Sequence, residues 1–260
     1  MTTVSVILLV YLAIFLHELG HFAEARRLNL PVQRFSVGFS PFGLGLDFHL
    51  KRFPETTFCL GLLPVGGFVQ IQGEEEDFDR VGSLSYKDTA LFSGAGIWMN
   101  LLSIFGAALL LRRVLLLSWD LPDAVLLGIG LLLYFGKSFL CRFLILPIGL
   151  LVMGVTVYGF ITHGAQESVG GPVSFMRDVT PDSLELREVF GKFMMASALL
   201  ALMNTMPIAP LDGASILDRL LQRWERIRLW KDRIGLVLLM GLVGCALFND
   251  AKLVLLSLFR

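Results

Sequence analysis

The 260-residue chain lacks closely spaced cysteines, an excess of charge of one sign, and an N-terminal cleavage signal. Each of these absences bears on the kind of protein it can be. Its three cysteines are widely spaced and form no Cys-x-x-Cys pair, so neither a disulfide framework nor a thiolate metal site is indicated. Basic and acidic residues balance at 22 each, and this zero net charge argues against a nucleic-acid-binding protein. The N-terminus lacks a basic stretch and a small-residue cleavage site, so we expect its first apolar run to be a retained membrane helix.

Apolar residues, in contrast, are abundant. They make up 55% of the chain, and the mean hydropathy is +0.71, more than a soluble domain of this size needs. This composition predicts an all-α polytopic membrane protein that forms one domain over residues 1–260. The segments expected to cross the membrane are 4–25, 90–111, 121–136, 143–162, 189–207 and 234–258, about six helices in all.

The first of these segments contains His17-Glu18-Leu19-Gly20-His21, a metal-binding HExxH motif within an apolar run. Four residues separate the two histidines, so on a helix both imidazoles lie on one face and can reach one metal ion. Glu18 lies beside them and can take a proton from a metal-bound water. Ionisable groups are expensive inside a bilayer, which favours a functional site over a helix turn that is polar by chance.

A catalytic zinc site needs a third protein ligand and one open position. His49 and His163 are candidates by residue type, although His49 lies in a polar-flanked segment and His163 at the opposite end of a predicted helix. Asp212 is the stronger candidate, because it follows an apolar helix at the depth expected for His17 and His21. Prolines 207 and 210 break regular hydrogen bonding there, and such backbone must line a cavity or be buried in protein. An ordinary helix exit with a solvated Asp212 is the alternative.

HExxH on the first membrane helix, followed near the chain's end by Asn204-x-x-Pro207 and Leu211-Asp212-Gly213, resembles the site-2 protease family of intramembrane zinc metalloproteases. The similarity is closest to the branch of the bacterial regulator-of-sigma-E protease. That branch carries PDZ domains between its second and third core helices, whereas residues 112–165 here are apolar and suggest extra membrane segments. Three further stretches resemble family elements: 38–41 with 63–69, 93–100, and 171–174.

The resemblance implies Zn²⁺ held by His17, His21 and Asp212, with Glu18 as general base. It further implies substrate transmembrane helices as partners, for example anti-sigma factors or remnant signal peptides. The substrate-binding residues that we predict are Asn204, Pro207, Gly66, Gly67 and Phe68. For Asn204, a helix–helix hydrogen bond is an alternative role. A non-enzymatic metal-binding membrane protein, either a transporter or an inactive relative, is the alternative function.

Residues 35–71 combine apolar residues with many glycines and predict short strands, a small re-entrant β element after the first helix. One edge could pair with an unwound substrate, or the element could be a structural hairpin that plugs the mouth of the site. Residues 214–233 alternate basic and apolar positions, which predicts a helix on the cytoplasmic leaflet or a docking face for a partner. The acidic run 74–77 is interpreted as a solvated loop.

Basic residues predict the orientation in the bilayer. Fifteen of the 22 lie in connections on one side of the six predicted helices, so the N-terminus should face away from the cytoplasm. His17 precedes Arg26 by nine residues, or about 13 Å of helix, which places the site near the cytoplasmic face. We therefore expect a multi-pass protein of a bacterial inner (plasma) membrane.

Overall fold

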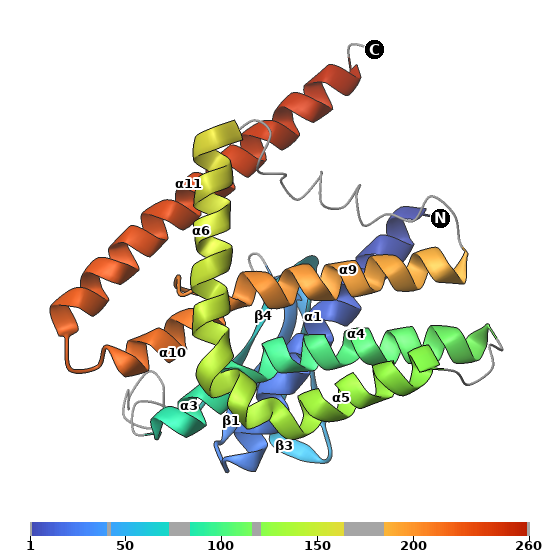
Figure 1. Ribbon diagram of the computed structural model, residues 1–260, viewed down its shortest axis with the longest axis horizontal. Coiled ribbons are helices and arrows are strands. Elements are labelled where there is room, and N and C mark those ends of the chain that lie inside the picture. Colours follow the sequence, from blue (N-terminus) through green and yellow to red (C-terminus); the bar gives the residue numbers. More distant parts are fainter. Residues whose placement is uncertain (1, 41–42, 73–83, 116–120, 164–184, 259–260) are drawn as a thin grey trace.

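The computed structural model describes residues 2–40, 43–72, 84–115, 121–163 and 185–258, which form helices and one small sheet (Figure 1). Helix α4 packs against α1, α5 and α9, while the sheet covers α1. The helices are α1 (Thr2–Arg27), α3 (Tyr86–Ser93), α4 (Ala95–Val114), α5 (Leu121–Phe139), η2 (Leu140–Leu144), α6 (Ile145–His163), α9 (Leu186–Thr205), α10 (Asp212–Leu220) and α11 (Glu225–Leu258). The strands are β1 (Val32–Phe39), β2 (Gly45–Leu50), β3 (Phe53–Gly61) and β4 (Leu63–Ile71).

Helix α1 is apolar along most of its length but buries a polar stripe near its C-terminal end. His17, Glu18, His21 and Glu24 are all buried, although each carries a polar or ionisable group. The helix ends where Asn29 adopts a positive φ of 56°, a conformation that asparagine tolerates better than most residues. Residues 7–27 are long and apolar enough to cross a membrane, which agrees with the first predicted segment.

The sheet has the strand order β2-β3-β1-β4, with β1 and β3 parallel and the other pairs antiparallel. It runs alongside α1: the Tyr11 hydroxyl donates to the Gly61 carbonyl at 2.7 Å, and the Arg26 guanidinium lies 5.5 Å from the Phe53 ring centre. These contacts are separated by fifteen residues of α1, or about 22 Å. The strands predicted after the first helix are therefore confirmed, and they begin at Val32, slightly earlier than expected.

The two faces of this sheet differ in chemistry. On the face towards α1, Phe35 and Phe58 pack with Phe22, and Leu46 and Phe48 continue the apolar surface beyond the helix. Leu46 is 70% exposed, so this apolar surface is not covered by the described residues. The opposite face carries polar pairs, which are Arg34 with Asp47 at 2.9 Å and Thr57 with His49 at 3.1 Å.

The second predicted membrane segment, 90–111, is not one helix. The chain breaks between α3 and α4 at Gly94, whose backbone packs closely on Cys141 and Ile145. A Cβ at Gly94 would lie 2.7 Å from the Cys141 Sγ, so this close approach needs glycine. Helix α4 then runs to Val114 and is itself a candidate membrane span.

Two predicted membrane helices, 121–136 and 143–162, are joined where a connection was expected. Residues 137–142 are helical and include part of the π-helical turn η2, after which α6 turns steeply away from the direction of α5 (Figure 1). The stretch contains neither glycine nor proline to end a helix, and its charge is satisfied internally, because Lys137 donates to buried Glu24 at 2.6 Å. Asp123, at the other end of α5, pairs with Arg112 and Arg113 of α4.

Within the described residues, three candidate membrane spans are found: 7–27, 95–114 and the continuous stretch 123–158. Helices α9 and α11 lie near the fifth and sixth predicted segments but are not among these three. The predicted surface segment 214–233 is divided between α10 and the first turns of α11. The acidic run 74–77 and the Gly-Pro stretch 171–174 lie outside the described residues.

Candidate metal centre

The two motif histidines meet Asp212 in a buried cluster. The Nε2 atoms of His17 and His21 are 3.3 Å apart, and they lie 3.1 and 3.3 Å from the Asp212 Oδ2. The histidines are one turn apart on α1, as their spacing predicts, and Asp212 is the first residue of α10. The structure therefore brings together the three predicted ligands, which come from opposite ends of the chain.

The chemistry of this cluster suits a cation. Asp212 Oδ2 is buried and has no hydrogen-bond partner in the part of the chain that the structure describes, although both imidazoles face it. Among the described residues, this is the group of histidine, cysteine and carboxylate side chains whose ligand atoms converge, all within 4.8 Å of one another. Two imidazoles and one carboxylate match the ligand set of a three-ligand catalytic zinc site with one position left open.

Helix α4 leaves space over the cluster at Gly96. A Cβ at this position would lie 2.5 Å from the Nε2 atoms of both His17 and His21. The same helix touches α1 through Gly20, where a side chain would collide with the Ala95 carbonyl. Glycine on each helix therefore lets the two backbones approach and keeps the space above the ligand atoms free.

The outer nitrogens of both imidazoles have partners as well. His21 Nδ1 lies 2.9 Å from the carbonyl oxygen of Phe92, near the end of α3. His17 Nδ1 lies 3.2 Å from the side-chain amide of Asn100, on α4. Contacts of this kind orient the rings of metal-binding histidines.

Glu18 is buried beside the cluster, with 6% of its surface exposed. Strand β4 passes close to it, because a Cβ at Gly67 would lie 2.7 Å from Glu18 Cγ and 2.9 Å from Oε1. β4 is an edge strand, paired with β1 on one side. A glycine at 67 therefore brings the sheet edge into contact with the predicted general base.

The other predicted residues lie in different surroundings. The Asn204 amide donates to the Leu200 carbonyl of its own helix at 3.0 Å, and Pro207 lies in the loop between α9 and α10. Gly66 adopts a positive φ of 66° beside Gly67, whereas Phe68 is about half exposed. Of the weaker ligand candidates, His49 lies on β2 with its Nε2 3.1 Å from the Thr57 hydroxyl, and His163 is the last residue of α6.

Sequence reasoning assigned no role to three residues at this site: Phe92, Gly96 and Asn100. Gly96 and Asn100 lie four residues apart on α4, so they face α1 together. A glycine and an asparagine four residues apart within an apolar stretch were the signal available in the sequence. The Phe92 contact uses a backbone carbonyl, which leaves no trace in residue type.

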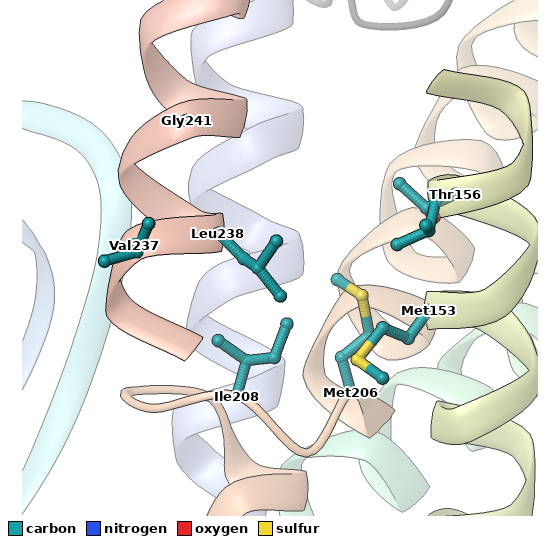
Figure 2. A pocket seen from close by; sticks show the side chains of 8 residues that line it. Met153, Thr156, Met206, Ile208, Val237, Leu238 and Gly241 are labelled. Atoms are coloured by element: carbon teal, nitrogen blue, oxygen red, sulfur yellow. The ribbon is translucent and has the colours of Figure 1, made fainter. Parts of the chain in front are cut away.

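An apolar pocket of about 250 Å³ adjoins the loop that leads to Asp212 (Figure 2). Met206 and Ile208 of this loop line one side, and side chains of α6 and α11 line the others. The start of this loop is tightly held, because Gly149 of α6 and Gly213 of α10 both pack against the backbone of Thr205, the last residue of α9, and of Met206. The position of Asp212, the predicted third ligand, thus depends on the packing of α6, α10 and α11 around this loop.

The sequence is also similar to a known protein family. The profile of peptidase family M50 matches residues 5–248. A protein of Fusobacterium nucleatum whose name assigns it to the zinc metalloproteases is 34% identical over 110 residues, which cover 40% of this chain and 30% of that protein. The regulator of sigma-W protease RasP of Bacillus subtilis is 36% identical over 80 residues, covering 31% of this chain and 18% of RasP. The matched stretches thus span less than a third of these relatives.

Proposed function

Because the chain belongs to peptidase family M50, the family of the site-2 proteases, we propose that it is an intramembrane zinc endopeptidase. The observation that carries this proposal is the convergence of His17, His21 and Asp212 beside a buried Glu18, on a helix able to cross a membrane. A transporter would be expected to place polar groups along several helices. An inactive relative would be expected to lack the general base.

In the proposed reaction each side chain has a separate task. His17, His21 and Asp212 hold the metal, and zinc when bound supplies a Lewis acid that lowers the pKa of a coordinated water to about 7. Glu18 accepts the proton of the attacking water and passes it to the departing amine. Glu18 is buried, so bulk water does not compete with the reacting groups for that proton.

We propose transmembrane segments of other proteins as substrates. A helix hides its peptide bonds, so hydrolysis requires an extended stretch of chain. β4 offers the edge at which such a stretch could add as a further strand, and Gly67 places this edge next to Glu18. Gly66, Phe68, Asn204 and Pro207 remain predicted substrate contacts. A sheet that only plugs the mouth of the site would instead leave cleavage independent of strand pairing.

The proposed setting is a bacterial inner membrane, with the site near its cytoplasmic face. Arg26 and Arg27 end α1 one to two turns after His21, and basic residues favour the cytoplasmic side. We keep six membrane crossings, a non-cytoplasmic N-terminus and a surface-lying segment at 214–233 as parts of this proposal. The name of RasP points to the regulation of a sigma factor in that relative, and anti-sigma factors or remnant signal peptides are the proposed substrate types here.

Glu18→Gln tests the proposal, because it removes the base and keeps the three ligands. Purified protein should retain zinc and its fold but lose cleavage of a model transmembrane substrate by about 10²–10⁴-fold. The double variant His17→Ala/His21→Ala is the matched comparison and should lose both zinc and cleavage. A wild-type protein that binds zinc without cleaving any transmembrane substrate would favour the non-enzymatic alternative. Full activity in Glu18→Gln would remove Glu18 from the mechanism.

A further inference from the structure

The inference concerns Asn100, a polar side chain that the proposed reaction does not use. Asn100 lies on α4 with 0% of its surface exposed, and its side-chain Nδ2 is 3.2 Å from His17 Nδ1. Its Oδ1 is also buried and has no hydrogen-bond partner among the described residues. A buried amide oxygen without a partner is costly, so this arrangement calls for a physical explanation.

The chemistry of a metal-binding imidazole supplies one. A neutral histidine carries one ring proton, and ligation through Nε2 requires that this proton be on Nδ1. His17 faces the cluster with Nε2, so in a metal-loaded site its Nδ1 is a donor. An amide N–H facing this N–H would be a donor against a donor. Rotation of the amide about its last side-chain bond instead presents Oδ1, which accepts the Nδ1 proton.

We propose that Asn100 is a positioning residue for the metal, whose Oδ1 accepts the Nδ1 hydrogen of His17 and fixes both the tautomer and the orientation of that ring. The role rests on the proposed zinc site. It parallels the Phe92 carbonyl, which lies 2.9 Å from the Nδ1 of His21. The two rings are thus oriented from α3 and α4, the helices on either side of the break at Gly94.

A simple packing role for Asn100 makes the opposite prediction about substitutions. If the side chain only fills space between α4 and α1, Asn100→Leu should be tolerated best, and a buried carboxylate should be harmful. If Oδ1 accepts the imidazole proton, Asn100→Asp should work, because a carboxylate accepts from Nδ1 and makes the ring a stronger ligand. Asn100→Leu should then fail, because leucine has a similar volume but no acceptor.

The decisive measurement is zinc affinity of the full chain in detergent, obtained by competition with a chromophoric chelator. We expect Asn100→Leu to bind zinc about 10–100-fold more weakly than the wild type and Asn100→Asp to bind it at least as tightly. Cobalt substitution gives a second readout, since the visible spectrum of a tetrahedral site should be kept in Asn100→Asp and altered in Asn100→Leu. Thermal unfolding of the metal-free variants checks that each is folded.

The outcomes separate this inference from the proposed function. If His17→Ala/His21→Ala binds zinc like the wild type, the metal site itself is wrong. If that variant loses zinc while Asn100→Leu keeps full affinity, only the role of Asn100 is overturned. Should Asn100→Leu fail to fold, Asn100→Ala takes its place, with the same expected loss. Loss of zinc by Asn100→Asp overturns the acceptor role under all these conditions.

Discussion

Gly96→Ala adds a single methyl group and should destroy the metal site without replacing any of the predicted ligands. The added Cβ would lie 2.5 Å from the Nε2 atoms of His17 and His21, whereas ordinary contact begins near 3.4 Å. Each imidazole would therefore have to move by about 0.9 Å. A functional metal site tolerates ligand distances within about 0.2 Å, so neither nitrogen could keep its place.

The two helices cannot easily move apart to make room for this methyl group. Gly20 already brings the backbone of α1 against Ala95, and Asn100 holds His17 one turn further along α4. Loss of a single outer contact to a metal-binding histidine costs about 10–100-fold in affinity. Because Gly96→Ala displaces both histidines, we expect zinc affinity to fall by more than about 100-fold and cleavage to be lost.

Gly106→Ala is the matched control, because it makes the same chemical change on the same helix. A Cβ at Gly106 would meet no atom within 4 Å among the described residues. This variant should keep zinc and activity and should be stabilised by about 1 kcal/mol, as alanine is the better helix former. Zinc content and substrate cleavage are measured for both purified variants. If Gly96→Ala retains zinc and cleaves like the wild type, the described approach of α4 to α1 is wrong.

Two further predictions concern the ligands and the substrate. Purified wild-type protein should contain about one zinc per chain. Metal analysis should show that His17→Ala/His21→Ala has lost most of this zinc and that Asp212→Ala binds zinc more weakly. The zinc content of His49→Ala should be unchanged, so this variant serves as the control. Full zinc after both histidine changes would refute the assignment. Val69→Pro and Cys59→Pro should impair cleavage of a helical membrane substrate while zinc stays bound, because proline deletes backbone donors in the sheet. Helix-destabilising residues in the substrate should speed its cleavage. Cleavage indifferent to both the prolines and substrate helicity would exclude presentation of an extended, strand-paired segment.

Local spacing predicted the parts of this site that depend on one helix. His17 and His21 had to share a face of α1, and the glycines and apolar residues of 35–71 had to favour strands. The contribution of Gly96 and Asn100 could not be derived in this way. Their importance arises from the approach of α4 to α1, which depends on contacts between residues about 80 positions apart.

The same limit explains the errors in the helix boundaries. Lys137 suggested a polar connection, but the partner that makes its charge acceptable in a continuous helix is Glu24, 113 residues earlier. Gly94 was placed inside an apolar run that predicted one helix, whereas its contact with Cys141 and Ile145 coincides with a break. Tertiary packing decided both cases, and a local pattern of hydrophobicity contains no information about it.

The two-faced sheet bears on a requirement of the proposed hydrolysis, since that reaction consumes one water for each bond cleaved and hydrocarbon dissolves almost none. Glu18 lies on the apolar side of the sheet, against Gly67 of β4. The opposite side carries Arg34, Asp47 and Thr57, which are groups that water solvates. A single layer of backbone therefore separates the face that contacts Glu18 from a face that carries water-binding groups. Under the proposed reaction, the sheet is the element that connects the base with groups able to hold its co-substrate.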